Sequence, residues 1–282
     1  MLPKLHFMKL LQFRLFFLLL LVSPFAKSQS SVELTGSVGM ASYYGDLVQG
    51  SPSFKQPSYA FGAGVAWNFT PHWAWVSDIG ILQVKASDSK NKRADLIARN
   101  LSFKSNIWNI NTVAQYNIRD ITDGKMFTPY VFLGIGIFHF NPFTIDRNGK
   151  KQYLQPQGTE GQGLAAYPDR TPYKLTQLEM PFGLGFKFQV NEKISLGLEF
   201  RYHYIDTDYL DDVSMAYPDK TILAAKDPNL PLLTYRGDEL PGGASYPKGT
   251  LSRGNPNNRD SYYTTQIKVA FRLKSNSISV NY

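Results

Sequence analysis

The sequence predicts an all-β fold, an eight-stranded antiparallel up-and-down transmembrane β-barrel with long surface loops. Three observations lead to this prediction. Eight segments alternate between apolar and polar side chains, the period-two pattern of a strand with one apolar face. The connections between these segments are short and long in turn. The chain also begins with a segment typical of export and offers no apolar run long enough for a transmembrane helix.

The clearest segments form a hairpin between Gln177 and Tyr204. Every even-numbered residue from Leu178 to Val190 is large and apolar, whereas the odd positions hold polar residues, proline or glycine. After residues 191–193 the alternation resumes, and each half is long enough to cross a bilayer at a tilt. The polar face combines glycines with charged residues, the mixture expected inside a narrow barrel. A soluble β-sandwich also alternates and is the alternative fold.

Residues 1–28 are predicted to be a secretory signal peptide, which leaves a barrel domain of residues 29–282. Basic residues precede a short apolar run at 15–22, and residues 26–28 (Ala-Lys-Ser) supply the small side chains that a signal peptidase recognises. The run is shorter than the roughly 20 residues of a spanning helix, and Pro24 ends it. We therefore expect export, with the barrel in the cell outer membrane.

The first four strands are expected in the N-terminal half of this domain. In each of them apolar residues recur at alternate positions, with small or polar residues between them. The predicted ranges are 32–40, 59–69, 73 to about 85, and 108–118. Residues 70–72 supply a tight turn, and residues 43–57 and 87–99 are expected to be surface loops. Trp67, Trp73 and Trp75 gather about the turn, as an aromatic belt at the periplasmic interface would.

The other four strands complete the barrel. The fifth, at 130–140, is apolar on both faces; the hairpin supplies the sixth and seventh; the eighth occupies 263–273. Asp120 to Lys125 is a predicted turn. The predicted long loops are 141–175 and 205–260.

The strand count decides what such a barrel can do. An even number of strands returns the chain to the side where it started, here the periplasm. Eight strands also give the size of the OmpA- and OmpX-like barrels, in which inward side chains just fill the interior. We therefore expect no aqueous channel, and a function located in the loops or on the outer wall.

The composition excludes several functional classes. The formal charge of +8 falls to +4 without residues 1–28, which hold four basic and no acidic residues. No basic cluster with interleaved aromatic residues remains, so no nucleic-acid binding is predicted. The chain has no cysteine, which excludes disulfides and a cysteine-ligated metal. No cofactor is predicted.

Charged residues on the inward face are expected to neutralise one another. A buried charge is costly alone and tolerable when it is paired and hydrogen-bonded. The candidates for this lumenal charge network are Glu33, Glu179, Lys187, Glu199, Arg201 and Lys268, with Arg272 as a further member. Glu199 and Arg201 in particular are predicted to share one network.

Histidine placement argues against catalysis. His72, His139 and His203 follow the predicted signal, and their spacing gives neither a two-histidine metal site nor a set of nucleophile, base and acid. The sequence therefore predicts no catalytic residue and no metal ligand. A hydrolase inside the barrel, using a serine with His203 or His139, is the alternative from another functional class.

The last long loop contains an acidic segment at 206–214 (DTDYLDDVS) with four carboxylates within seven residues. Calcium binding needs several oxygen ligands, but this segment lacks the glycine that follows the alternating acids of the calcium-loop motif. We therefore expect a solvated, turn-forming segment, with calcium binding as the weaker alternative.

Three short motifs in the loops are distinctive. They comprise Tyr44, Gly45 and Asp46 after the first strand, Asp208, Tyr209, Leu210, Asp211 and Asp212 in the acidic segment, and Arg253, Gly254, Asn255 and Pro256 before the last strand. Together they resemble the pattern of a Bacteroidota outer-membrane barrel family that includes PorG, a component of the type IX secretion system.

This resemblance implies a non-enzymatic barrel that is a structural or accessory component of an envelope assembly, most plainly type IX secretion. Its partners would be outer-membrane lipid and other envelope or secretion-system proteins, and the motif residues are candidates for partner contact. The alternative is a stand-alone outer-membrane barrel that binds an extracellular ligand.

Overall fold

The computed structural model of the chain describes residues 30–48, 55–120, 126–249 and 251–275. The predicted signal peptide and nearly all of the predicted turn between Asp120 and Lys125 lie outside the described residues. Within these ranges, no helix has the length and apolar character needed to cross a membrane.

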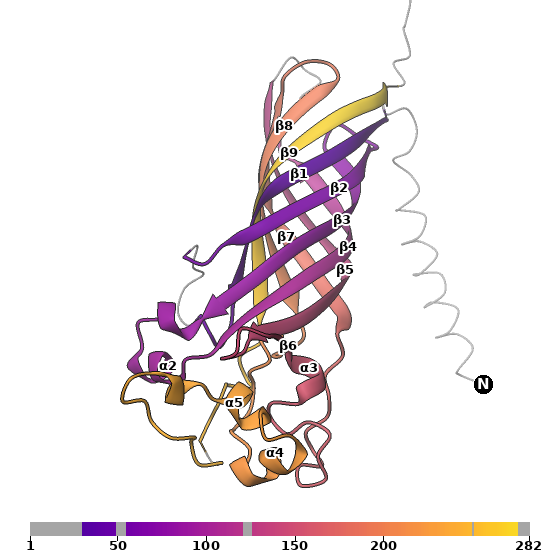
Figure 1. Ribbon diagram of the computed structural model, residues 1–282. Helices are drawn as coiled ribbons and strands as arrows, with labels where there is room; N and C mark the ends of the chain where they lie inside the picture. Colours follow the sequence, from indigo (N-terminus) through magenta and orange to yellow (C-terminus); the bar gives the residue numbers. More distant parts are fainter. Residues whose placement is uncertain (1–29, 49–54, 121–125, 250, 276–282) are drawn as a thin grey trace, which may run out of the picture.

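Eight long antiparallel strands close into a tilted barrel (Figure 1). Each pairs with the next of the eight along the chain, and the first and last pair with each other, which closes the wall. The strands are β1 (Ser31–Tyr44), β2 (Ser58–Asn68), β3 (Trp73–Ser87), β4 (Ser102–Asn117), β5 (Phe127–Ile145), β7 (Thr176–Gln189), β8 (Ile194–Ile205) and β9 (Ser261–Ser275). A three-residue strand, β6 (Lys151–Tyr153), pairs antiparallel with the last three residues of β5 and is not part of the barrel wall. The predicted fold class is confirmed.

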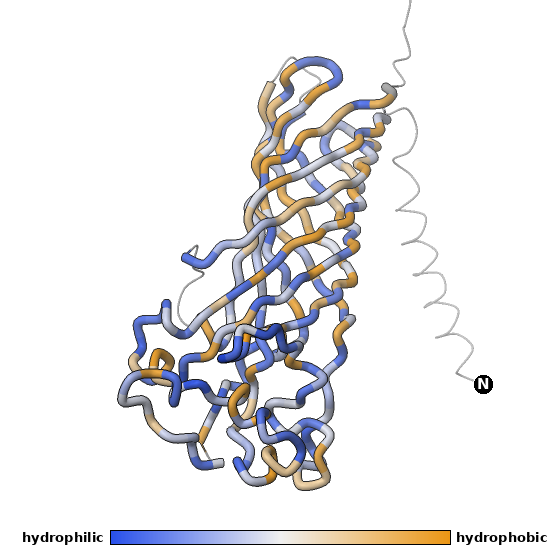
Figure 2. Tube along the Cα trace, viewed as in Figure 1, coloured by the Kyte–Doolittle hydropathy of each residue, from blue (hydrophilic) through white to orange (hydrophobic). Residues whose placement is uncertain are grey.

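Apolar residues recur along the barrel strands (Figure 2), and the many that point outward form an apolar band on the outer wall. Outward side chains such as Ile135 on β5 and Leu178 on β7 are 68% and 73% exposed. In a closed barrel wall, neighbouring strands hydrogen-bond each other's backbone N–H and C=O groups, so the wall can face lipid without leaving these groups unpaired. Along β3 the outward residues change from Ile81 to Gln83, whose amide donates to Asn106 of β4 at 2.7 Å. The wall therefore continues beyond the lipid-facing band into water.

Short turns gather at one end of the barrel and long loops at the other (Figure 1). The turn between β2 and β3 lies at the short-turn end, where Trp67 and Trp75 are paired across the two strands. Both indoles are nearly half exposed, as is Trp73 beside them. This outward position is the one that interfacial tryptophans occupy.

Several strands are longer at the loop end than the alternation predicts. The predicted ranges end or begin at Met40, Trp108 and Phe140, whereas β1 runs to Tyr44, β4 starts at Ser102 and β5 runs to Ile145. The predicted loop starts at residues 43 and 141 are therefore wrong. The extension of β4 carries the outward polar residues Ser102, Lys104 and Asn106, and that of β5 begins with Asn141 and Pro142. The regular apolar alternation that marks a membrane strand is therefore interrupted before these strands end.

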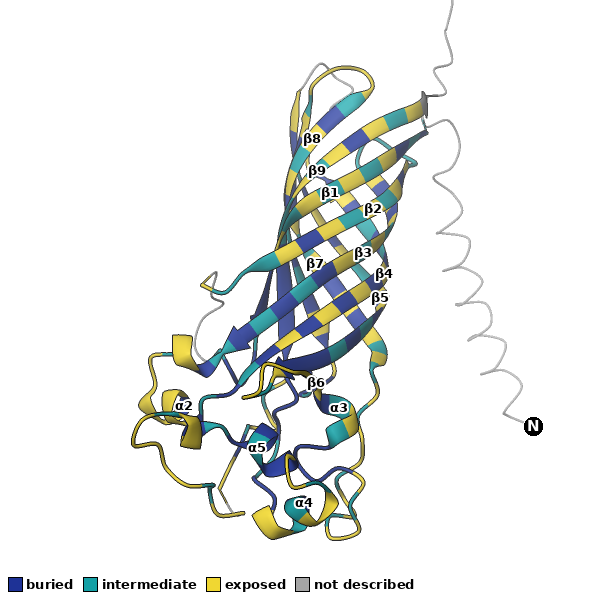
Figure 3. Ribbon diagram, viewed as in Figure 1, coloured by how far each residue is buried: buried dark blue, intermediate teal, exposed yellow. Residues whose placement is uncertain are grey.

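The long loops fold together into a cap over one end of the barrel (Figure 3). Their helices are η2 (Asp88–Lys90), α2 (Ala94–Arg99), α3 (Leu154–Gln157), α4 (Lys220–Lys226), α5 (Leu230–Thr234) and η3 (Gly237–Glu239). Loop residues Leu47, Leu210 and Val213 are buried in one apolar cluster with Phe138 and Phe140 from the barrel mouth. The cap therefore shares its core with the barrel, which a plain surface loop would not.

Candidate functional site

Arg201 of β8 is the centre of an ion-pair network inside the barrel. Its Nη1 and Nη2 atoms donate to the two carboxylate oxygens of Asp78 on β3, each at 2.9 Å. Its Nε atom donates to Glu199 at 3.1 Å, and the second oxygen of Glu199 accepts from Lys268 of β9 and from the Tyr130 hydroxyl, both at 2.9 Å. All of these side chains are buried or nearly so. Glu199 and Arg201 thus lie in one shared network.

Glu33 anchors a second lumenal cluster, in which Lys187 donates to it at 2.6 Å and Arg272 lies 3.5 Å away. Both cations approach one buried carboxylate, so the charge of Glu33 is compensated within the lumen, whereas Lys187 and Arg272 share that single negative charge.

Glu179 anchors a third cluster. His203 Nδ1 lies 3.1 Å from one carboxylate oxygen, which also accepts a hydrogen bond from Tyr262, and Asn109 donates to the other oxygen at 3.1 Å. The predicted lumenal charges thus fall into three clusters whose members come from seven of the eight barrel strands.

Sequence reasoning missed four partners in these clusters, namely Asp78, Asn109, Tyr130 and Tyr262. Asp78 could have been predicted, because it lies two residues before Gly80 on β3 and therefore points into the barrel as well. A carboxylate inside the barrel is costly without a partner, so a nearby cation was to be expected. The other three are ordinary strand residues whose partners lie far away in sequence, and nothing local marks them.

Side chains occupy the barrel interior. An added Cβ on Gly185 of β7 would lie 2.3 Å from the ring of Tyr130 on the neighbouring β5, so a glycine at this position leaves room for that ring to pass over β7 and reach Glu199 of β8. Two interior cavities, one beside Lys187 and one beside Arg201, have volumes of about 30 Å³ each. Each has room for roughly one water molecule.

The three motif segments meet in the cap. Arg253 Nη1 donates to Glu160 at 3.0 Å and to the Asp212 carbonyl, and Glu160 accepts the backbone N–H of Ser214 at 2.9 Å. The Asn255 N–H donates to Asp46 Oδ2 at 2.8 Å. One buried cluster therefore ties the first, third and fourth long loops together.

Arg99, the last residue of α2, extends this cluster to the second long loop. Its Nε atom donates to Asp88 at 2.7 Å, and its other nitrogens donate to the carbonyls of Arg253 and Asp46. Helix α2 ends here because Asn100 takes a left-handed conformation with φ 58°. All four long loops thus converge on Arg99 and Arg253.

The motif glycines are required by close approach in this cluster. A Cβ on Gly45 would lie 1.9 Å from Asp260 Oδ1, and a Cβ on Gly254 would lie 2.3 Å from Asp46 Oδ2. Any side chain there would push the carboxylates out of their hydrogen bonds. Of the other motif residues, Tyr44 is half-buried and Pro256 is exposed.

The expectation of a solvated acidic segment is wrong. Asp208, Asp211 and Asp212 are at most 4% exposed, and the ring of Tyr209 stacks on Tyr173 with centroids 4.7 Å apart. Asp211 accepts a hydrogen bond from the Tyr43 hydroxyl, and Asp212 accepts from the hydroxyls of Thr159 and Tyr173 and lies 3.7 Å from Arg253. These partners lie far away in sequence, so the local sequence does not reveal the burial. Among the described residues, no group of three or more His, Cys, Asp or Glu side chains is arranged to hold a metal ion.

Burial raises the pKa of these carboxyls. The pKa of Asp208 is raised to about 7 and that of Asp212 to about 6, in both cases chiefly by desolvation. Burial, together with the charge of Asp46, raises the pKa of Asp211 well above its usual value. The Tyr43 hydroxyl lies 2.5 Å from Asp211 and 2.9 Å from Asp260. Because a hydroxyl has one hydrogen, a proton on one of these two carboxyls would turn both contacts into full hydrogen bonds, in agreement with their raised pKa values.

The histidines of the alternative hydrolase have other partners. His203 is paired with Glu179 and stacks on Tyr262 with ring centroids 4.1 Å apart. His139 Nδ1 lies 2.9 Å from the Thr176 hydroxyl on the outer wall. Nδ1 of each imidazole thus contacts a group other than a serine, and His203 Nε2 has no hydrogen-bond partner among the described residues, so no serine hydroxyl is bonded to it.

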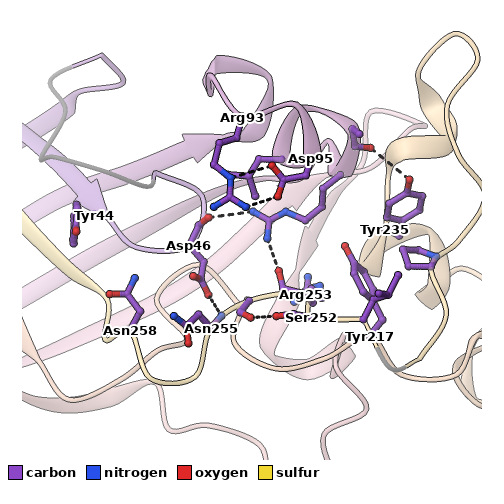
Figure 4. Close-up of a pocket in the computed structure, with 16 residues that line it drawn as sticks. Tyr44, Asp46, Arg93, Asp95, Tyr217, Tyr235, Ser252, Arg253, Asn255 and Asn258 are labelled. Carbon is purple, nitrogen blue, oxygen red and sulfur yellow. Dashed lines mark hydrogen bonds and ion pairs between the residues drawn. The ribbon is translucent and has the colours of Figure 1, made fainter.

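A pocket of about 880 Å³ opens on the cap beside the motif cluster (Figure 4). In this view Tyr44 and Asn258 lie at one end, Tyr217 and Tyr235 at the other, and Asp46, Asn255 and Arg253 between them. Its volume falls within the usual range for small-molecule sites.

Comparisons with known proteins give distant similarities. No curated protein sequence matches the chain. Neisserial surface protein A is 10% identical with a TM-score of 0.44, covering 86% of this chain and 99% of its own. Ail from Yersinia pestis is 9% identical with a TM-score of 0.41, covering 88% and 100%. The N-terminal barrel domain of OprF from Pseudomonas aeruginosa is 10% identical with a TM-score of 0.38, covering 87% and 98%.

The comparison with protein families is more direct. The sequence model of one protein family, described as the outer membrane protein beta-barrel domain, matches residues 14–222, well over half of the 282 residues. The closed barrel and its apolar outer band agree with this match. The chain therefore belongs to the outer membrane protein beta-barrel domain family and is a protein of the outer membrane.

Proposed function

We propose that this protein is a non-enzymatic structural or accessory component of an envelope assembly. The observation that carries the proposal is the convergence of all four long loops on Arg99 and Arg253, above a barrel filled by its own side chains. A wall fixed in lipid can hold such a cap at a defined height above the membrane, which suits an anchor for other proteins.

Transport and catalysis have less support. The lumenal charges are paired across the barrel, so the passage of a large solute would require several buried ion pairs to break. His203 and His139 are engaged with Glu179 and Thr176, whereas a hydrolase would need a serine hydroxyl on the imidazole.

The resemblance of the three motifs to the PorG-containing family favours type IX secretion as the assembly and a Bacteroidota source. Burial changes the role expected of the motif residues. Asp46, Asp211, Asp212 and Arg253 are at most 3% exposed, so in this proposal they shape the cap and leave partner contact to exposed neighbours. Residues 1–28 act as the signal that exports the barrel.

Partner contacts would use two surfaces. Short turns of outer-membrane barrels face the periplasm and long loops face outward. The turn at residues 191–193 is exposed, and its shape is fixed by Asn191, whose side chain accepts the N–H groups of Lys193 and Ile194. The cap offers exposed positions such as Lys220 on α4.

The test combines deletion with site-specific photo-crosslinking in the native host. A photoreactive residue at Glu192 or Lys220 should capture envelope proteins, whereas the same residue at the lipid-facing Ile135 should not. Deletion should reduce export of many cargo proteins, and His203→Ala, which removes the imidazole of the hydrolase alternative, should retain function if the barrel folds. Normal export in the deletion strain would reject the secretion role, and the additional absence of crosslinked partners would reject the accessory role.

A further inference from the structure

We infer that the cap pocket binds a neutral saccharide. This inference is independent of the proposed secretion role. It rests on the pocket of about 880 Å³ in Figure 4, on the internal pairing of its arginines, and on neutral polar groups in its wall that have no partner among the described residues.

The arginines that line the pocket are already paired with carboxylates, whereas Asp46, which also lines it, has its Oδ1 atom buried without a hydrogen-bond partner among the described residues. Arg93 pairs with Asp95, Arg99 with Asp88 at 2.7 Å, and Arg253 with Glu160 at 3.0 Å. A site for a phosphate, sulfate or carboxylate needs N–H donors that are free to bond the anion. Most N–H groups of Arg99 and Arg253 already donate to carboxylates and carbonyls of the cap. The paired arginines therefore disfavour an anionic ligand, and a neutral hydroxyl-bearing ligand is the one that needs no further cation or anion in the wall.

Two neutral polar groups remain open to a ligand. The Tyr217 ring is 4% exposed, yet its hydroxyl has no hydrogen-bond partner anywhere in the described ranges. The side-chain amide of Asn258, at the other end of the pocket, likewise has no partner among these residues. A hydroxyl and an amide both donate and accept, as sugar hydroxyls do.

Apolar groups alternate with these polar ones. Tyr44, Leu251 and Pro247 line the same pocket, and Leu251 is 56% exposed although it is a large apolar residue. A pyranose ring presents C–H groups on its faces and hydroxyls around its edge, so it needs both kinds of neighbour. An aromatic ring with a polar end, such as Tyr44, suits such contacts.

The pocket floor is preformed. Arg99 and Arg253 are fixed by hydrogen bonds from four loops, and Asp46 holds the Asn255 backbone at 2.8 Å. A rigid site loses less conformational entropy when a ligand binds. Weak neutral hydrogen bonds can therefore suffice for specific binding.

The experiment uses the full protein, labelled and purified in a detergent without a sugar headgroup, on a glycan array. The array carries neutral hexose, N-acetylhexosamine and deoxyhexose oligomers beside sulfated and uronic-acid glycans, and short peptides serve as the comparison class. The array hit is then titrated against Tyr217→Phe and Asn258→Ala. The matched control is Tyr153→Phe, which removes an exposed tyrosine hydroxyl of β6 outside the pocket. Heat-dependent gel migration checks that each variant is folded.

We expect binding to neutral glycans, with affinity reduced roughly fivefold by each pocket substitution and unchanged by Tyr153→Phe, because a neutral hydrogen bond contributes about that factor. Binding to anionic glycans or peptides alone overturns the inference. So does the absence of binding to every neutral glycan, or a hit whose affinity is the same in both pocket variants and the wild type.

Discussion

Replacing Arg201 by alanine should destabilise the barrel strongly, because this one guanidinium serves two carboxylates. The substitution removes two 2.9 Å hydrogen bonds to Asp78 and the 3.1 Å bond to Glu199. Glu199 would keep Lys268 and Tyr130, each at 2.9 Å, whereas Asp78 would keep only a 3.3 Å hydrogen bond from Asn111. Asp78 would therefore become a nearly uncompensated charge in the lumen.

The expected loss follows from that asymmetry. Breaking a buried pair by removing one partner costs roughly 3 to 5 kcal/mol of unfolding free energy. Because Glu199 keeps Lys268 and Tyr130, we expect Arg201→Ala to cost ~3 kcal/mol, the lower end of that range. The double variant Arg201→Ala with Asp78→Asn should recover part of the loss, because the stranded charge is then gone. Arg147→Ala is the control, since it breaks a partly exposed pair with Asp238 at 3.3 Å and should cost at most ~1 kcal/mol.

The assay is reversible urea unfolding in lipid vesicles, followed by the fluorescence of the four tryptophans, all of which lie outward and lose lipid contact on unfolding. If Arg201→Ala and Glu199→Ala both unfold at the wild-type urea concentration, these residues contact water and the lumenal network as described is wrong.

Three further outcomes are expected. Unheated and boiled samples of the outer-membrane fraction should migrate differently on a gel, because a wall with paired backbone groups resists detergent until it is heated; recovery of a soluble periplasmic protein would contradict the barrel. Planar bilayers should show no stable conductance steps, because side chains fill the lumen, and reproducible large steps would reveal an open pore. The cap should become less stable as the pH rises. Carboxyls with a raised pKa bind protons more tightly in the folded state, so the contribution of Asp208 and Asp212 is complete below about pH 4 and is lost through about pH 6 to 7. Proteolysis within residues 206–249 should accelerate over that window, and a pH-independent rate would contradict the burial of these groups.

The barrel could be predicted from the sequence because lipid imposes a strict pattern. Where a strand faces lipid, as from Leu178 to Val190, every outward residue must be apolar, and the period-two signal follows directly. Inward charges such as Glu199 and Arg201 could be assigned from the same parity. The signal fails at Ser102 to Asn106 and at Asn141 to Ile145, where the strands stand in water and either face can be polar.

The cap could not be predicted in the same way. Its motifs can be recognised in the sequence, but the partners that bury them lie far away along the chain. Arg253 donates a hydrogen bond to Glu160, 93 residues away, and Asn255 donates to Asp46, 209 residues away. Local composition therefore suggested solvated acids, whereas the fold buries them and brings hydroxyl donors to Asp211 and Asp212. Glu160, Asp88 and Arg99 have no local feature that marks them as members of the cluster.

The central claim is that the long loops form one rigid cap locked by Arg253. Hydrogen–deuterium exchange tests it most directly, because the N–H groups of Ser214 and Asn255 are bonded to Glu160 and Asp46, at 2.9 and 2.8 Å. In the wild type these amides should exchange as slowly as those of β8, and Arg253→Met should accelerate them while the β8 amides stay protected. Exchange at the rate of an unstructured peptide in the wild type would show that the loops are not locked and would contradict the account.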